Sequence, residues 1–124
     1  MSETFKEQRR KVAFSCRILA KEGLVEGMLG HVSVRVSGDE MLIRCRSEED
    51  YGVIFTRDSD IRKVDFDGRG TDLEGRYEVP KELPIHGEIY KARPEVECVI
   101  HAHPPAVLVC GIAGLEFRPV FWCL

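Results

Sequence analysis

Residues 31–45 constrain the fold most strongly, because they carry the pattern of a β-hairpin. The segment HVSVRV alternates apolar and polar side chains in steps of two, which is the period of a strand. SGD follows as a turn, and EMLIRC returns as a second strand. The sequence therefore predicts an antiparallel pair of strands around which the other elements have to pack.

Helical and extended patterns lie on both sides of this hairpin. Apolar side chains repeat with helical spacing between residues 5 and 22, and Gly23 can cap that helix. The other predicted elements are a strand at VIFT (53–56), an apolar segment before a DG turn (60–70), a helix over 82–92, a strand at VECVIHAH (96–103) and a helix at AVLVCGIAG (106–114). This order indicates one mixed α/β domain over residues 1–124.

Composition narrows the class of protein. The chain is 44% hydrophobic and 31% charged with a net charge of −3, so no nucleic-acid partner is expected. The first ten residues are polar and charged, and no apolar stretch reaches the roughly 18 residues that a membrane span needs, so neither a leader nor a membrane contact is expected. Five scattered cysteines without a CxxC pair predict reduced, mostly buried thiols in a cytoplasmic protein.

The segment IHAHPP (100–105) places two histidines one residue apart at the end of a strand. Residues i and i+2 of a strand face the same side, so His101 and His103 should project together while Ile100 and Ala102 turn into packing. Two neutral imidazoles on one face suit zinc, manganese, iron or another divalent ion. A pair of hydrogen-bonded histidines at a surface or interface is the alternative.

Glu82 opens the helix just upstream of the histidine strand. A short helix that leads back into a strand can return this carboxylate to the strand's end, where it could ligate a metal or act as a base. Stabilisation of the helix start by a negative charge is the alternative. His86 shares the helix face of Glu82 and is predicted to be a packed or hydrogen-bonded histidine. His31 follows Gly30 at a strand start, a common place for ligand contact.

Together, GMLGHVSVR (27–35), ELPIHGEIYKARPEV (82–96) and VIHAHPPAV (99–107) resemble the class II aldolase/adducin family over nearly the whole chain. The resemblance implies a three-layer α/β/α fold around a mainly antiparallel sheet, usually assembled as a tetramer. It also implies a divalent metal, Zn²⁺ or Mn²⁺, held by His101 and His103. Glu82 would touch this metal and serve as the catalytic acid/base in carbon–carbon cleavage.

Two departures from the family pattern bear on the substrate. Family members that act on sugar phosphates hold the phosphate with an Asn after the glycine loop and with Ser-Ser before the glutamate; here those positions are His31 and Pro80-Lys81. His31 and Lys81, beside Gly30, would suit a substrate carboxylate instead. The resemblance is therefore closest to the family's branch of decarboxylases that act on hydroxylated aromatic or pyridine dicarboxylic acids.

The second departure concerns the length of the chain. No histidine follows His103, although the family supplies a third metal-binding histidine far downstream, so we expect a domain that is C-terminally truncated and leaves apolar surface uncovered. A metal-dependent lyase that decarboxylates a small aromatic acid is the leading prediction. An aldolase or epimerase for a small sugar or sugar phosphate is the first alternative, and an adducin-like interaction module or inactive relic is the second.

Overall fold

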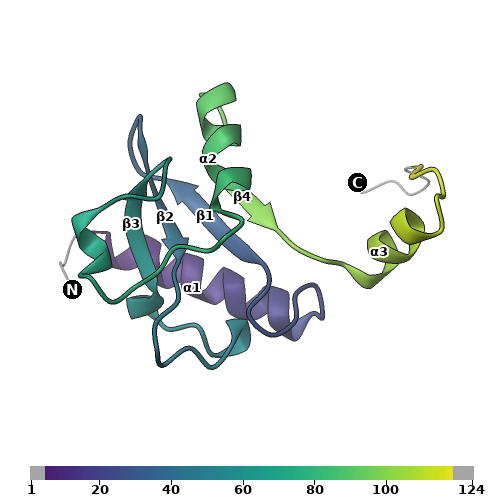
Figure 1. Cartoon of the computed structure of the whole chain (residues 1–124), viewed down its shortest axis with the longest axis horizontal. Helices are drawn as coiled ribbons and strands as arrows, with labels where there is room; N and C mark the ends of the chain where they lie inside the picture. The colour runs from purple at the N-terminus through teal and green to yellow at the C-terminus, as the bar shows by residue number, and fades with distance from the viewer. Residues whose placement is uncertain (1–4, 119–124) are drawn as a thin grey trace.

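The computed structural model of the chain describes residues 5–118, which form an antiparallel four-stranded sheet with helices on both faces (Figure 1). The strands lie in the order β3-β2-β1-β4. In chain order the elements are α1 (Lys6–Lys21), β1 (His31–Arg35), β2 (Glu40–Arg44), the 3₁₀ turns η1 (Val53–Phe55) and η2 (Asp58–Asp60), β3 (Ile61–Asp65), η3 (Thr71–Leu73), α2 (Leu83–Ala92), β4 (Cys98–His101) and α3 (Pro105–Ile112).

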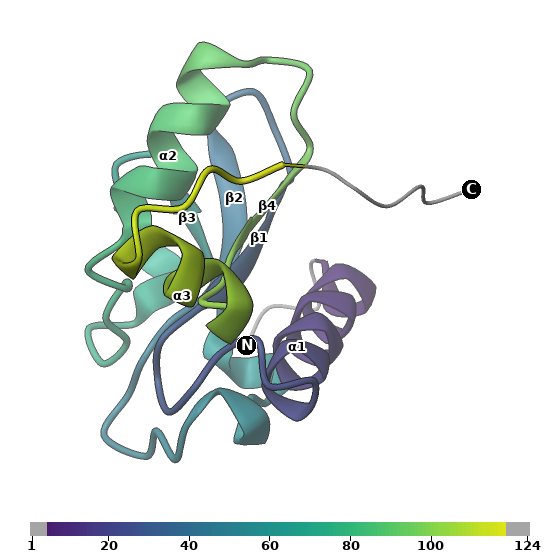
Figure 2. The ribbon, with the colours of Figure 1, turned by 90° about the vertical axis from the view of Figure 1, so that its right-hand side faces the viewer.

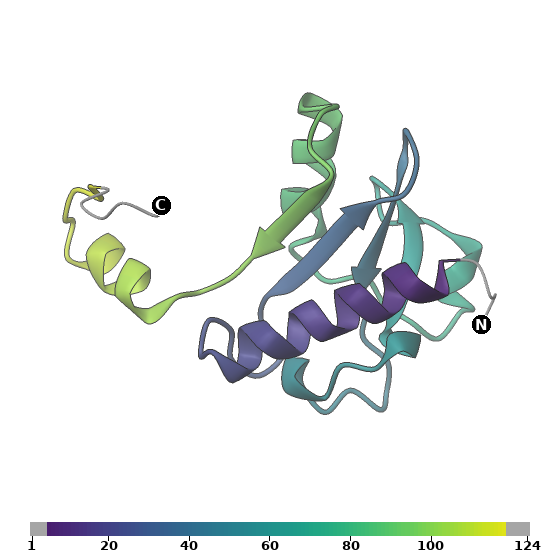
Figure 3. The same ribbon diagram turned by 180° about the vertical axis from the view of Figure 1, so that it is seen from behind.

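The sheet separates two buried clusters, and α1 and α2 lie on its opposite faces (Figure 2). On one face α1 packs across β1, β2 and β3, as the view from behind shows (Figure 3). The other face carries the cluster that includes Met41, Phe66 and Tyr90 under α2. At Gly87 a side chain would collide with the carbonyl of Phe66, so only glycine allows α2 to lie this close to the chain leaving β3. The predicted three-layer α/β/α architecture is confirmed.

The central strand β1 joins two distant parts of the chain. It pairs with β2 through the predicted hairpin and with β4 through a register in which His31 faces His101 and Ser33 faces Val99. Both pairings are antiparallel, so these opposed residues have their side chains on the same face of the sheet. The register therefore brings the glycine-loop histidine and the histidine strand side by side.

The prediction of a strand at 53–56 is wrong. The segment forms the 3₁₀ turn η1, in which Phe55 N–H bonds to Gly52 and Thr56 N–H bonds to Val53. Gly52 has a φ of 105°, and Val53 N–H donates to the Gly27 carbonyl at 2.8 Å. Those contacts tie the segment to the glycine loop and bury Val53, so its backbone is not available for a sheet.

Only some of the cysteines are buried as predicted. Cys16 and Cys45 are buried, and burial raises the pKa of Cys45 to about 12, which keeps that thiol protonated. Cys98 is exposed and Cys110 is half-buried. Cys123 lies outside the described residues. All four described cysteines are free thiols.

The helix α3 stands apart from the sheet at the end of an extended segment (Figure 1). None of its residues is buried, although it is apolar, and Val109 and Ile112 are among the exposed side chains. This agrees with the uncovered apolar surface predicted from the sequence. Among the described helices, none is long and apolar enough to cross a membrane.

A buried ion pair fastens α1 to the loop after β3. The Arg9 guanidinium is 1% exposed, lies 2.8 Å from the Asp72 carboxylate and donates to the Ile61 carbonyl. Asp72 also accepts a hydrogen bond from the Lys63 N–H at 2.7 Å. Burial opposes ionisation of Asp72, but the hydrogen bonds from Arg9 and Lys63 and the charges of Arg9 and Arg62 outweigh it and lower its pKa below 3.8.

We therefore expect Asp72→Asn to lower the free energy of unfolding by about 2 kcal/mol, because the substitution removes the negative charge that pairs with the buried Arg9 guanidinium. The lowered pKa means that Asp72 stabilises the fold above pH 3.8, and that this stabilisation is lost as the pH falls through the folded-state value. Urea unfolding between pH 7 and pH 2 would measure both effects. The exposed Asp67 of the surface pair with Lys91 gives the control: Asp67→Asn should change stability little. Equal losses for the two variants would contradict the prediction.

Candidate active site

His101 and His103 converge through one ring nitrogen each. Their Nε2 atoms are 2.9 Å apart and the rings meet edge to face. The backbone N–H of His103 donates to the Leu24 carbonyl at 2.8 Å, and Ala102 packs against the cluster under α1. The chain after β4 is thus held so that both imidazoles point to the same side, as the sequence predicts.

The structure corrects the prediction for Ile100. The sequence predicts that its side chain packs in the interior, but the residue is 57% exposed. The reason is that α1 packs across β1, β2 and β3 rather than over β4, which forms the edge of the sheet.

The electrostatics of His101 fit a cation between the two imidazoles. Burial and the neighbouring His103 lower the pKa of His101, against an opposing effect of the Glu82 carboxylate. The His101 Nδ1 atom is buried and has no hydrogen-bond partner among residues 5–118. The two Nε2 atoms lie at hydrogen-bond distance from each other, which is the alternative that the sequence left open, and imidazoles that converge in this way could also ligate a divalent metal.

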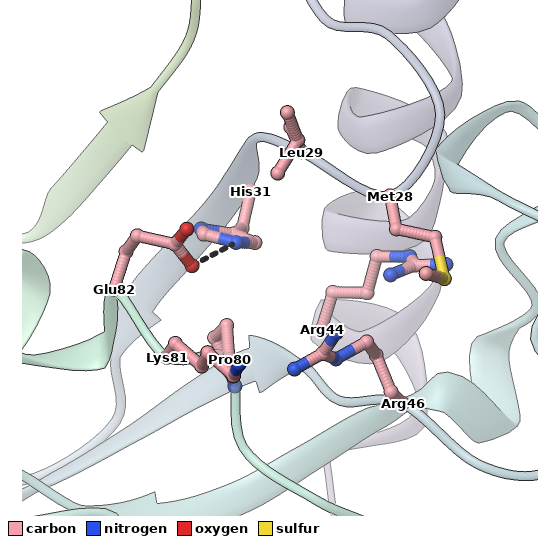
Figure 4. Close-up of a pocket in the computed structure, with 8 residues that line it drawn as sticks. All are labelled: Met28, Leu29, His31, Arg44, Arg46, Pro80, Lys81 and Glu82. Carbon is pink, nitrogen blue, oxygen red and sulfur yellow. Dashed lines mark ion pairs between the residues drawn. The ribbon is translucent and has the colours of Figure 1, made fainter.

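Glu82 precedes α2 as its N-cap residue and lies beside His31 (Figure 4). The Glu82 Oε2 atom is 3.7 Å from His31 Nε2, and the two rings of His31 and His101 have their centroids 5.3 Å apart. Within residues 5–118, no group of three or more His, Cys, Asp and Glu side chains is placed to hold a metal ion. The structure thus joins the two histidines and puts Glu82 next to their neighbour His31, while the ligand set with Glu82 stays a prediction.

A row of buried polar groups continues behind His31. His86, in α2, is fully buried, and its Nε2 lies 3.4 Å from His31 Nδ1. Its Nδ1 lies 2.7 Å from the Ser33 hydroxyl, which in turn lies 2.8 Å from the Tyr90 hydroxyl. Burial and the charge of His101 lower the pKa of His86 to about 4. The prediction that His86 is a hydrogen-bonded helix histidine is confirmed.

Burial and the neighbouring His86 and His101 also lower the pKa of His31, to about 3. The four histidines of the chain therefore form one continuous cluster, from His86 through His31 to His101 and His103.

A cavity of about 190 Å³ opens in front of His31 and Glu82 (Figure 4). Besides these two, it is lined by Met28, Leu29, Arg44, Arg46, Pro80 and Lys81. Arg44 is held by the Thr56 hydroxyl at 2.9 Å and by the Asp50 carboxylate at 2.6 Å. The Nε atom of Arg46 is buried and has no hydrogen-bond partner in the part of the chain that the structure describes. Three cationic side chains thus face one small cavity, which suits an anionic ligand.

The three residues predicted to bind substrate do not all line the cavity. His31 and Lys81 line the cavity, whereas Gly30 does not. Gly30 has a φ of 99°, and a side chain there would collide with Val25, so this position needs glycine for the turn into β1. A backbone contact between Gly30 and substrate stays a prediction.

Sequence reasoning missed Arg44 and Arg46. Their spacing of two at the end of a strand places both on one face, which is the signal that could have found them.

Comparison with known proteins finds a matching family and relatives of known name. Residues 10–122 match the family described as the class II aldolase and adducin N-terminal domain. The chain is 50% identical to the 3,4-dihydroxyphthalate decarboxylase of Rhodococcus jostii (strain RHA1), over 98% of this chain and 51% of that protein. It is 46% identical to the 3,4-dihydroxyphthalate decarboxylase of Arthrobacter keyseri, over 90% of this chain and 46% of that one.

A solved structure shares the fold. The L-fuculose 1-phosphate aldolase from Glaciozyma antarctica PI12 superposes with a TM-score of 0.66 and 28% identity, over 80% of this chain and 41% of that chain. The chain spans about half the length of the curated relatives it matches.

The histidine pair predicts a metal-binding measurement. Equilibrium dialysis or calorimetry with Zn²⁺ and Mn²⁺ should detect binding that His101→Ala and His103→Ala each weaken by at least roughly 100-fold, since loss of an outer hydrogen-bond partner alone costs 10–100-fold. Cys98→Ser is the matched control, because Cys98 is an exposed thiol on the same strand. Binding that survives both histidine substitutions but is lost in Cys98→Ser would contradict the assignment.

Proposed function

Because this chain belongs to the class II aldolase and adducin family, we propose that its site is that of a divalent-metal-dependent carbon–carbon lyase. The proposed reaction is release of CO₂ from an aromatic acid with adjacent hydroxyl groups. The name of its relatives, 3,4-dihydroxyphthalate decarboxylase, makes 3,4-dihydroxyphthalate the first substrate to test. This compound carries two carboxylates and two hydroxyls on one ring.

The cationic lining of the cavity carries the proposal. Arg44, Arg46 and Lys81 surround a space in which the family's aldolases are expected to hold a phosphate with serine and asparagine side chains. Guanidinium and ammonium groups bind carboxylates through charge-assisted hydrogen bonds. The His31 ring adds a polar group to the lining. We propose that Arg46, Lys81 and His31 bind the substrate, with Arg44 held in place by Asp50 and supporting the wall.

The residues proposed to hold the metal are His101, His103 and Glu82. A bound Zn²⁺ or Mn²⁺ ion would act as a Lewis acid toward an oxygen of the substrate and draw electrons from the bond that breaks. Decarboxylation replaces a carboxylate with hydrogen, so a proton has to reach the ring carbon that loses CO₂. Glu82 is the proposed carrier of this proton, since its carboxylate borders the cavity and lies beside the histidines.

The alternative is an aldolase acting on a sugar phosphate. The fold is shared with an L-fuculose 1-phosphate aldolase, but at 28% identity, against 46–50% for the two decarboxylases. The lining of the cavity also contains none of the serine and asparagine side chains with which the family's sugar-phosphate aldolases are expected to hold the phosphate. We therefore rank the aldolase second.

We also propose a homotetramer in the cytoplasm. The tetramer is what the family resemblance implies, and the uncovered apolar side chains of α3 support further packing partners. The free thiols at Cys16, Cys45, Cys98 and Cys110 support a reducing compartment.

The reaction can be tested by CO₂ release. Purified protein reconstituted with Zn²⁺ or Mn²⁺ should release CO₂ from 3,4-dihydroxyphthalate, and Glu82→Gln should lower kcat by about 10²- to 10⁴-fold because the side chain no longer exchanges a proton. Glu88→Gln, on the exposed side of the same helix, is the matched control and should retain activity. Release of an aldehyde from a sugar phosphate without CO₂ from any hydroxylated aromatic acid would favour the aldolase and overturn the proposal.

A second measurement tests the role of the cavity. Loss of a hydrogen bond to a charged group costs about 1.5–3 kcal/mol, so Arg46→Gln should raise KM for the dicarboxylate by roughly 10- to 100-fold. The effect on kcat should be smaller, since this side chain binds the substrate and the transition state alike. Arg76→Gln is the control, because Arg76 is 67% exposed and does not line this cavity. An unchanged KM in Arg46→Gln would rule out Arg46 as an anchor.

A further inference from the structure

A chain of buried polar groups leads from the middle of α2 to the cavity. Tyr90 OH and Ser33 Oγ are 2.8 Å apart, Ser33 Oγ and His86 Nδ1 are 2.7 Å apart, and His86 Nε2 and His31 Nδ1 are 3.4 Å apart. His31 then turns its Nε2 toward the Glu82 carboxylate at 3.7 Å. The four members before Glu82 are each at most 2% exposed, so each depends on its neighbours for hydrogen bonds.

The two ends of this row of polar groups set the donor-to-acceptor direction of its hydrogen bonds. Glu82 is a carboxylate, which in its ionised form only accepts hydrogen bonds. At the other end, burial raises the pKa of the Tyr90 phenol, although hydrogen bonds with Ser33 and the Val99 backbone work against this, so the phenol keeps its proton. A buried O–H needs an acceptor, and the Ser33 hydroxyl is placed to accept it.

Each interior group can both donate and accept a hydrogen bond, so the orientation fixed at the two ends determines every hydrogen bond between them. Tyr90 donates to Ser33, and Ser33 donates to His86 Nδ1. The proton of His86 is then on Nε2, from which it donates to His31 Nδ1. His31 is left with its own proton on Nε2, facing Glu82.

The opposite direction is electrostatically unfavourable at both ends. It would place the lone pair of His31 Nε2 against the Glu82 carboxylate, and it would leave the Tyr90 proton without the Ser33 acceptor. The cluster thus has one arrangement in which every internal donor meets an acceptor and the last N–H faces a carboxylate 3.7 Å away.

We propose that Tyr90, Ser33 and His86 are positioning residues that hold His31 in the tautomer protonated on Nε2, so that the cavity contains a fixed N–H donor beside Glu82. Nδ1 of His31 then accepts a hydrogen bond and Nε2 carries hydrogen, so His31 presents an N–H donor to the cavity and has no free nitrogen lone pair for a metal ion. The inference concerns the chain without metal or substrate. It therefore stands or fails separately from the proposed reaction.

Imidazole ¹⁵N chemical shifts report the tautomer directly. The full chain, labelled with ¹⁵N and kept free of metal and substrate at neutral pH, should show proton-bearing Nε2 and unprotonated Nδ1 for both His31 and His86. A His31 ring protonated on Nδ1, or an average of the two tautomers, would overturn the proposal.

Variants test the role of the polar groups that follow His31 in this row, Tyr90 and Ser33. Ser33→Ala removes the donor to His86 Nδ1 and should shift both rings to a mixture of tautomers, and Tyr90→Phe should cause a smaller change in the same direction. Val32→Ala is the matched control, since it truncates a buried side chain of the same strand on the opposite face. If Val32→Ala mixed the tautomers as much as Ser33→Ala does, the effect would be one of general loosening and the proposal would fail. If Ser33→Ala does not fold, the wild-type shifts and Tyr90→Phe decide the question.

Discussion

The antiparallel register between β1 and β4 is the constraint on which the site depends. It sets His31 opposite His101 and Ser33 opposite Val99, although about 70 residues separate the partners along the chain. A slip of one residue would turn one strand's side chains to the other face and separate the histidines. Because α2 leads into β4, the same register also places α2 over the face of the sheet on which His86 and Tyr90 contact Ser33. One strand pairing thus assembles groups contributed by three elements.

The two faces of the sheet differ in chemistry. The cluster under α1 is apolar, and it stabilises the fold by removing hydrocarbon from water. The face under α2 contains buried polar side chains, among them His31, Ser33 and His86. Such groups cost free energy unless they are hydrogen-bonded, and here each contacts the next. A connected polar row of this kind fixes one arrangement of the layer, because each group depends on the next for its hydrogen bond.

Much of this was predictable from the sequence because the signals are local and periodic. The hairpin, the helix over 82–92 and the shared direction of His101 and His103 all follow from side-chain spacing. The turn at Val53–Phe55 did not follow, since its conformation depends on a bond to Gly27, which is distant in sequence. The exposure of Ile100 depends on which strands α1 covers, and no local pattern encodes that. Arg44 and Arg46 were missed for a similar reason: an arginine near a strand end is ordinarily solvent-exposed, and only the fold turns these two to one cavity.

The charges around the cavity indicate how a dicarboxylate would sit in the proposed reaction. Arg44 is paired with Asp50, so its charge is already balanced. Arg46 and Lys81 also line the cavity. A carboxylate that leaves as CO₂ loses its negative charge in the transition state, so a cation gripping it would stabilise the substrate more than the transition state and slow the reaction. Arg46 and Lys81 should accordingly hold the carboxylate that stays on the ring. That orientation would leave the departing carboxylate on the side of Glu82 and the histidines, where Glu82 is proposed to supply the replacing proton.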